Sequence, residues 1–173
     1  MSNQPQDWYA VTTKGLSGRK VRAILDELNV QHFLPLIETE VEHYGMKEKT
    51  FKPLVLNLVF ICADYSTIQS LIDDHHIPMT FMLDSVTQCP LSYSNKKIQD
   101  IKYLLQYPDE ILRLTNDNLK PGEHVRVLDG EFAGIEGELI RIKGHKRVVV
   151  RLDGLFSLAT AYVPVAYLEK LDH

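Results

Sequence analysis

Three glycines in the segment DGEFAGIEGELIRI, residues 129–142, have the spacing closest to a ligand-binding motif. Gly130, Gly134 and Gly137 follow one alternating stretch and precede another. Glycine-rich turns bind phosphate where they lead into a helix, because the first N–H groups of that helix donate to the phosphate oxygens. Here the next segment is strand-like, and no Lys-Ser or Lys-Thr pair follows. The pattern therefore favours the corners of a small β-barrel, with Phe132 in its core.

Residue types suited to catalysis and metal binding occur without the spacing that either needs. His75 and His76 are adjacent, so in a helix their side chains would point about 100° apart instead of sharing a metal ion. His43 could join them in principle, but no cysteine or carboxylate spacing supports a zinc site. Serine, histidine and aspartate are present, yet no nucleophile motif positions them. The sequence predicts a non-catalytic protein with no metal and no cofactor.

The composition is that of a soluble globular protein with one domain or two small ones. The chain has 173 residues, 45% hydrophobic and 24% charged, and a net charge of −4. Residues 118–173 carry eight basic and eight acidic residues, so the net negative charge belongs to residues 1–117. No broad basic footprint for non-specific nucleic-acid binding is present. Any contact with nucleic acid must therefore be local.

Targeting signals are not apparent. The segment MSNQPQDWYA lacks the pattern of a secretory signal, and the apolar run PLVLNLVFICA is too short for a membrane helix. Cys62 and Cys89 lack metal-site spacing, which favours buried free thiols in a reducing compartment. We expect a cytoplasmic monomer without membrane contact.

The elements that position these residues fall into two groups. In the first group the spacing predicts strands at 7–13, 31–37, 53–63 and 77–83 and helices at 17–30, 66–74 and 94–108, with Ser17 and Ser66 as N-cap candidates. The polar segment 38–50 is expected to form an exposed hairpin or loop. This order predicts a split βαβ arrangement, with helices on one face of a mostly antiparallel sheet.

The second group contains only strand and turn patterns. Five short strands in about 55 residues indicate a small SH3-like barrel. Gly144 is expected at the first central position of a two-residue type II′ turn. The predicted class is α+β, a ferredoxin-like split βαβ domain at 1–106, a linker at 107–117 and the barrel at 118–173.

Several segments resemble a known family. The segment PGEHVRVLDGEFAGIEGELIRI resembles a KOW motif at Gly122, Val125, Val127, Gly130, Phe132, Gly134 and Gly137. DWYAVTTKGLSGRKV resembles the opening strand and helix of the NusG N-terminal (NGN) domain, and PLSYSNKKI resembles the start of its last helix. PLVLNLVFI falls where that family has Pro-Leu-Phe-Pro-Gly-Tyr-Val-Phe-Val. The chain is thus similar to NusG-family transcription elongation and antitermination factors over nearly its whole length.

One departure from the family pattern is informative. The stretch Val55-Leu56-Asn57-Leu58 replaces Phe-Pro-Gly-Tyr and loses its aromatic residues. General elongation factors tend to keep that motif. The change suggests a specialised paralogue similar to RfaH or to the UpxY type.

The resemblance implies two binding surfaces in the NGN domain. Four residues occupy positions that would grip the clamp helices of RNA polymerase, although some would be core residues in an isolated domain: Val55, Leu58, Phe60 and Phe81. Four basic residues lie where RfaH-like relatives contact the non-template DNA strand, although alone they would be a solvated helix end: Lys14, Arg19, Lys20 and Arg22.

A third surface is implied in the KOW domain. The segment LFSLAT occupies the position of the loop that meets the NusE ribosomal protein, with Leu155, Phe156 and Leu158 as contacts. Because they follow the turn signal Asp153-Gly154, Leu155 and Phe156 are expected to be exposed. The implied partner of this domain is NusE or Rho.

The implied function is that of a factor that binds RNA polymerase, reduces pausing or termination and recruits a second factor. The alternative is a ribosome- or RNA-binding KOW protein without polymerase contact. An rRNA-binding protein should be basic, so the acidic charge of this chain favours the first function.

Overall fold

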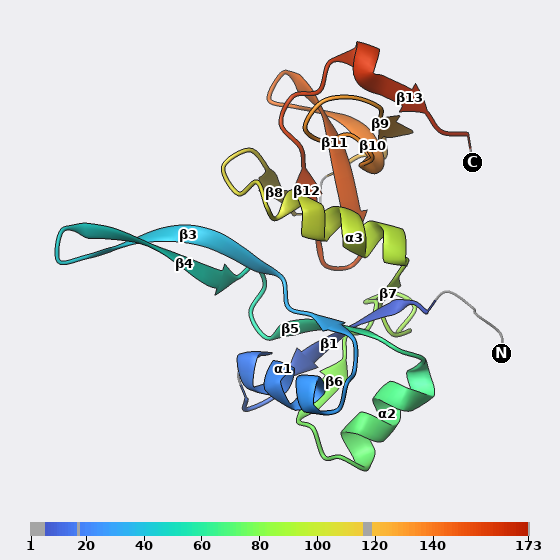
Figure 1. Ribbon diagram of the computed structural model, residues 1–173. Helices are drawn as coiled ribbons and strands as arrows, with labels where there is room; N and C mark the ends of the chain where they lie inside the picture. Colours follow the sequence, from blue (N-terminus) through green and yellow to red (C-terminus); the bar gives the residue numbers. More distant parts are fainter. Residues whose placement is uncertain (1–5, 17, 116–118, 173) are drawn as a thin grey trace. The chain divides into compact units, whose positions relative to one another are not determined.

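The chain forms two compact units, residues 1–95 and 96–173 (Figure 1). The computed structural model describes residues 6–16, 18–115 and 119–172, so Ser17, the N-cap candidate, lies outside the described residues. The α+β class expected from the sequence is confirmed, with three helices and three antiparallel sheets in the described residues. The two units divide at the start of helix α3 (Asn95–Leu104), and strand β8 (Leu112–Leu114) lies in the segment expected to be a linker.

The first unit is built on a small antiparallel sheet. Its strands have the order β2-β5-β1-β6, and β7 also pairs with β1. The bounds are β1 Trp8–Thr13, β2 His32–Phe33, β5 Leu58–Cys62, β6 Met79–Phe81 and β7 Ser92–Tyr93. Strand β5 is buried along nearly its whole length, as its apolar sequence on both faces predicts.

Two helices cover one face of this sheet. Helices α1 (Gly18–Glu27) and α2 (Tyr65–Asp73) pack their apolar stripes against this face, forming one core: Val11, Val21, Leu25, Val59, Ile61, Ile68 and Leu71. The N-cap of α2 is Asp64, not Ser66: the Asp64 carboxylate accepts from the Thr67 N–H at 2.7 Å, and Ser66 donates to the same oxygen. A carboxylate is a strong cap because it also favours the positive end of the helix dipole.

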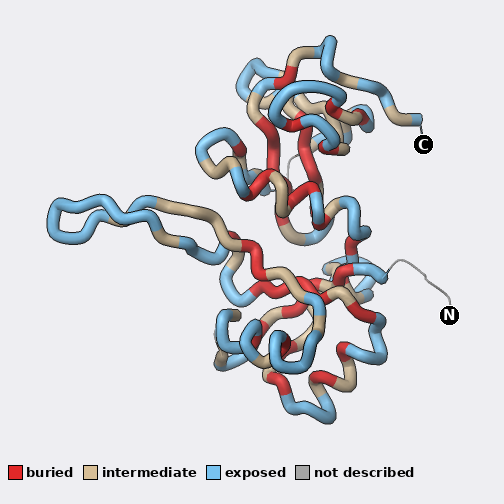
Figure 2. Tube along the Cα trace, in the orientation of Figure 1, coloured by how far each residue is buried: buried red, intermediate tan, exposed pale blue. Residues whose placement is uncertain are grey.

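A long hairpin extends from the first unit. Strands β3 (Leu36–His43) and β4 (Met46–Pro53) pair only with each other, and the far end of the hairpin is exposed (Figures 1 and 2). Tyr44 and Gly45 both have positive φ, at 51° and 77°, which is the backbone of a type I′ turn. Of the two forms expected for residues 38–50, an exposed hairpin or a loop, the structure shows the hairpin, and it is longer than expected.

The second unit contains a six-stranded antiparallel sheet of order β13-β9-β10-β11-β12-β8. Its further bounds are β9 Glu123–Val127, β10 Glu136–Ile142, β11 His145–Leu152, β12 Phe156–Ala159, the 3₁₀ helix Val165–Tyr167 and β13 Leu168–Lys170. The turn between β10 and β11 has positive φ at both Lys143 and Gly144. The expected type II′ turn is therefore wrong: this is a type I′ turn with glycine at its second central position.

Polar contacts around the buried Asp100 join helix α3 to the rest of the second unit. Asp100 is 5% exposed, accepts from Lys96 Nζ at 2.6 Å and accepts from the Glu136 N–H at 3.2 Å. Lys96 also donates to the Gly134 carbonyl at 2.7 Å. Burial raises the pKa of the Asp100 carboxyl, and the hydrogen bond from Lys96 opposes that rise.

Two further expectations concern the surface of the chain. No helix in the described part of the chain is both long and apolar enough to cross a membrane. The expectation of buried thiols is wrong for Cys89, which is exposed in the loop before β7, whereas Cys62 is half-buried on β5.

The glycines of the segment 129–142 shape the barrel in two ways. Gly130 and Gly134 have positive φ, at 85° and 94°, in the loop between β9 and β10, where a side chain would be strained. Gly137 lies within β10 instead, and a Cβ there would come within 2.3 Å of the Val149 carbonyl oxygen. Its role is therefore close backbone approach, not the bend expected from the sequence.

Replacing Gly137 by alanine should destabilise the barrel by about 3 kcal/mol, because the added methyl group collides with the paired backbone of β11. Gly144→Ala is the matched variant: the space around it is open, so only the positive φ opposes alanine, at about 1 kcal/mol. Amide hydrogen exchange of β10 and β11 would measure both losses. Equal losses in the two variants would contradict this role of Gly137.

Candidate functional site

The four residues expected to contact polymerase do not share one face of the sheet. Phe60 lies opposite Ala10 and Leu58 opposite Thr12, whereas Val11, the residue between, lies opposite Phe81 on its other side. Residues directly opposite each other point to the same face, and successive residues point to opposite faces. Phe81 therefore lies on the face that packs against α1 and α2, away from Leu58 and Phe60.

Leu58 and Phe60 belong to a buried aromatic face. Phe60 is fully buried, stacked on Phe33 at 5.9 Å and in edge contact with Tyr93 at 6.0 Å between ring centroids. Trp8, on the same face, donates from Nε1 to Asn95 Oδ1 at 3.0 Å. Phe33 and Tyr93 were not identified from the sequence, because strand register must be known before they can be placed beside Phe60.

Phe81 is half-buried on the other face. It stacks on Tyr65 at 4.8 Å and meets the edge of Tyr9 at 5.7 Å. These contacts place it at the margin of the core formed with α1 and α2. Its surroundings are aromatic, but they are separate from those of Phe60.

A group of exposed apolar residues lies at the end of the sheet, in the turn before β5 and on the neighbouring strand β4. Leu56 is 78% exposed and Val55 is half-buried, while Phe51 at the end of β4 is 55% exposed. The Thr13 N–H donates to the Asn57 carbonyl at 2.9 Å and ties this turn to the end of β1. Within the stretch that departs from the family pattern, Leu56 and Asn57 are therefore exposed, whereas Leu58 is buried.

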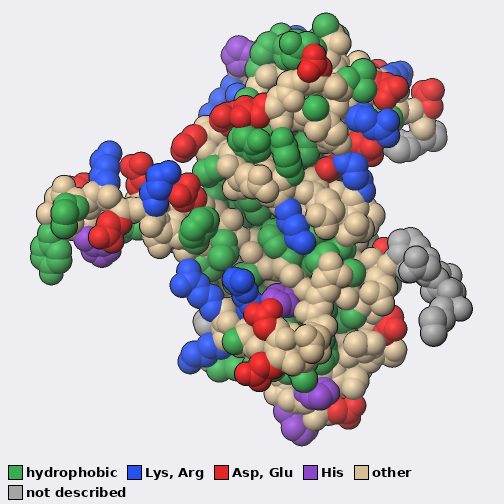
Figure 3. All heavy atoms as spheres, in the orientation of Figure 1, with side chains coloured by type: hydrophobic (Ala, Val, Ile, Leu, Met, Phe, Trp, Pro, Cys, Tyr) green, Lys and Arg blue, Asp and Glu red, His purple; other side chains and the backbone are tan. Residues whose placement is uncertain are grey.

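The basic residues lie at the same end of the sheet as the turn before β5. Lys14 follows directly on β1, and Arg19 and Lys20 lie in the first turn of α1, which has no acidic residue. All three side chains are exposed, and the Arg19 guanidinium donates to the Phe51 carbonyl at 2.9 Å. Figure 3 shows lysine and arginine side chains gathered on the surface of the first unit. Arg22, one turn further on, approaches Asp26 at 4.0 Å.

We refer to Lys14, Arg19, Lys20, Phe51 and Leu56 as the basic–apolar end. Arg19 and Lys20, two cations in the first turn of α1, oppose the helix dipole, so local helix stability does not account for them. A surface of exposed apolar groups beside cations suits a partner that is apolar and anionic. In the described residues no cluster of histidine, cysteine and carboxylate side chains could hold a metal ion.

The expected docking loop of the barrel is largely core. Phe156 is 2% exposed and Leu158 is fully buried, because both lie on β12, which pairs with β11 on one side and β8 on the other. The expectation that Phe156 is exposed is wrong. Leu155 is half-buried in the preceding turn, where its N–H donates to the Leu152 carbonyl.

The remaining residues of the KOW pattern are structural. Val125, Val127 and Phe132 are buried, as expected for barrel core. A Cβ at Gly122 would come within 2.3 Å of the Leu139 carbonyl oxygen, so this glycine also permits a close approach of two backbones.

Two substitutions compare the effect of a new charge on stability at a core position and at a surface position of the first unit. Phe60→Asp buries a charge among aromatic rings and should cost about 4 kcal/mol or more. Leu56→Asp changes an exposed turn residue and should shift stability by no more than about 0.5 kcal/mol. Urea unfolding followed by the fluorescence of Trp8 would measure both, and a stable Phe60→Asp variant would contradict the burial of this face.

Comparisons with known proteins cover both units. A family model described as "Transcription termination factor nusG" matches residues 6–102, and a KOW motif model matches residues 121–151. No curated protein matches the sequence.

Two solved structures are similar to this chain. "Domain interaction in Thermotoga maritima NusG" is 16% identical with a TM-score of 0.39, covering 96% of this chain and 98% of that chain. "Crystal Structure of MjSpt4:Spt5 complex conformation B" is 16% identical with a TM-score of 0.24, covering 96% of this chain and 97% of that chain. The assignment rests on the family models instead: the first spans more than half of the chain, and the KOW match confirms the motif that follows it. The chain belongs to the NusG family of transcription factors.

Proposed function

We propose that this protein is a transcription elongation and antitermination factor that binds RNA polymerase through its first unit. The observation that carries the proposal is the NusG family match over residues 6–102, followed along the chain by the KOW motif at 121–151. The factor acts in the cytoplasm by binding, as a monomer, without catalysis or a cofactor. The family description names termination. The antitermination role is inferred from the replaced motif at residues 55–58, which suggests a specialised paralogue similar to RfaH or the UpxY type.

The polymerase contact is centred on the turn before β5. Leu56 and Val55 supply the accessible apolar surface there, and an apolar anchor at the centre of an interface carries much of its binding energy. Leu58 and Phe60 support this turn from the buried face of the sheet, because they lie on β5, the strand that follows it directly. This arrangement suits the clamp helices, which the family resemblance implies as the partner.

The non-template DNA strand is the proposed partner of the basic residues. Lys14, Arg19 and Lys20 lie at the same end as Leu56, so a protein anchored through that turn would bring these cations to one place on the elongation complex. The hydrogen bond to the Phe51 carbonyl fixes the direction of the Arg19 guanidinium. Arg22 extends the row of cations along α1.

The barrel is proposed to recruit a second factor, either the NusE ribosomal protein or Rho. Within residues 155–158, Leu155 is the side chain that a partner can reach, since Phe156 and Leu158 are core. A docking surface at this turn would therefore be smaller than the family pattern implies.

Leu56→Asp should reduce recovery of RNA polymerase with the tagged full-length protein by tenfold or more, because it places a charge at the apolar centre of the contact. Val86→Asp makes a similar change at an exposed apolar residue of the same unit and should leave recovery unchanged. Affinity purification from the native cell lysate with quantitative mass spectrometry would measure both.

Two outcomes of that purification, and one outcome of a separate transcription assay, would contradict parts of this proposal. Recovery of polymerase with Leu56→Asp at the wild-type level would overturn the placement of the contact. Ribosomal subunits in place of polymerase in the wild-type sample would favour the RNA-binding alternative. Purified protein that increases termination on a template with an intrinsic terminator would contradict antitermination.

Removing cations from the basic–apolar end should weaken the interaction with DNA and reduce its salt dependence. For Lys14→Gln with Lys20→Gln, the slope of log affinity against log salt should fall by about 0.7 for each lost phosphate contact. Lys120→Gln with Lys143→Gln removes two exposed charges from the second unit and is the control. Titration of assembled elongation complexes at several KCl concentrations measures the slopes, and identical slopes in the two double variants would exclude this DNA contact.

A further inference from the structure

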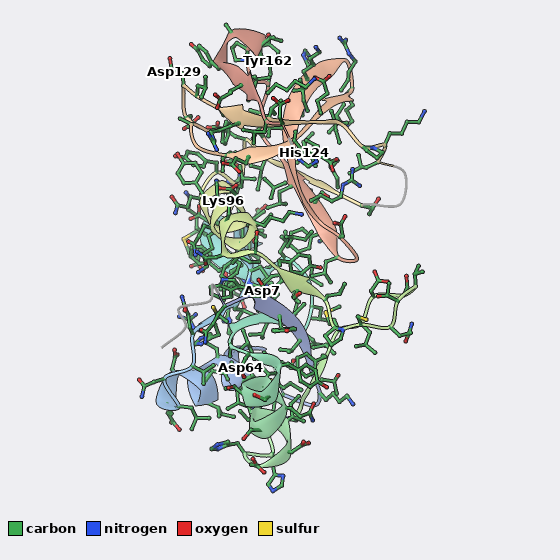
Figure 4. The ribbon with its side chains drawn as sticks, turned by 90° about the vertical axis from the view of Figure 1, so that its right-hand side faces the viewer. Asp7, Asp64, Lys96, His124, Asp129 and Tyr162 are labelled. Atoms are coloured by element: carbon green, nitrogen blue, oxygen red, sulfur yellow. The ribbon has the colours of Figure 1, made fainter. Side chains whose placement is uncertain are left out.

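A hollow of about 230 Å³ lies on the second unit, apart from residues 155–158. It is bounded by the loop after β9 and by the segment that leads to the 3₁₀ helix, with Glu110 contributed from the chain before β8. Its lining includes Glu110, Asp129, Glu131, Phe132, Tyr162 and Tyr167. Asp129 and Tyr162 lie at the same end of this unit (Figure 4).

The walls of this hollow are held by main-chain hydrogen bonds. The Leu128 N–H donates to the Tyr167 carbonyl at 2.7 Å, which joins the two walls. The Tyr167 ring lies over Gly130, where a Cβ would come within 3.4 Å of it. Tyr103 donates to the Glu131 carbonyl. A cavity fixed in this way loses little conformational entropy when a ligand enters.

The back of the hollow is aromatic and apolar. Phe132, Val127 and Val163 are buried, and Tyr107 packs edge-on against Phe132 with ring centroids 5.5 Å apart. Tyr162 is 56% exposed and presents its ring at the mouth, in edge contact with His145 at 6.1 Å. Aromatic faces attract cations through the ring quadrupole.

The charged groups at the mouth all carry the same sign. Glu110, Asp129 and Glu131 are exposed, and the lining contains no lysine, arginine or histidine. Among the described residues, none of these three carboxylates has an ion-pair partner within 4.0 Å. Glu131 raises the pKa of the Glu110 carboxyl through a shared hydrogen bond and through repulsion. Like charges held together in this way favour a cation between them.

We propose that this hollow binds an arginine side chain of a partner protein. Its volume is below that of most small-molecule pockets, about 300–1,000 Å³, and suits a single side chain. A guanidinium can stack on an aromatic ring and donate two parallel hydrogen bonds to a carboxylate. The apolar back and the acidic mouth match the apolar stem and the charged head of arginine.

The experiment uses the full-length, ¹⁵N-labelled protein with two probe peptides, acetyl-Gly-Arg-Gly-amide and its citrulline counterpart. Citrulline has nearly the shape of arginine but carries no charge. The arginine peptide should shift the amide signals of residues 128–133 and 161–167, and the citrulline peptide should bind at least tenfold more weakly. Equal binding of the two peptides, or shifts confined to other residues, would overturn the proposal.

Variants of the lining residues test the acidic charge and the aromatic ring separately. Glu131→Gln should weaken binding of the arginine peptide about fivefold, which corresponds to about 1 kcal/mol for one exposed carboxylate. Tyr162→Ala should also weaken binding of this peptide. Glu48→Gln removes one exposed carboxylate in the first unit and is the charge-matched control. Glu131 and Tyr162 are both exposed, so neither variant should disturb the fold. Affinity unchanged in both lining variants would show that the hollow is not the binding site.

Discussion

The antiparallel pairing of β1 with β5 is the constraint on which the first unit depends. Five residue pairs join these two central strands, from Trp8 opposite Cys62 to Thr12 opposite Leu58. This register assigns Val59 and Ile61 to the helix-covered face and Leu58 and Phe60 to the aromatic face. The pairing ends where the Thr13 N–H donates to the Asn57 carbonyl, so the chain leaves β1 and enters β5 at the same end of the sheet. For that reason the exposed Leu56, before β5, and Lys14, after β1, lie at this end.

The order and type of most elements could be predicted from the sequence, because they depend on local patterns. The spacing of Val21, Ile24, Leu25 and Leu28 gave α1, and the glycines at 130 and 134 gave the corners of the barrel. Local pattern also indicated that the polar, charged segment 38–50 forms an exposed hairpin or loop, and the structure shows the hairpin.

The candidate sites could not be predicted as well, because they depend on strand register and on contacts distant in sequence. Phe60 and Phe81 look alike along the chain, and only their pairing with β1 shows that they lie on opposite faces. Phe156 follows a turn signal, yet β8 pairs beside it and helps to bury it. The acidic hollow needs Glu110 from before β8 and Tyr162 from after β12, two segments that share no local pattern.

Trp8 gives this fold a built-in optical reporter. It is the single tryptophan of the chain, it is fully buried, and its indole N–H donates to Asn95, the first residue of α3. Buried indoles emit at shorter wavelength than hydrated ones, so the emission spectrum is sensitive to any loss of this buried, hydrogen-bonded environment in the first unit. A partner that exposes the indole to water would therefore cause a red shift, without an added label.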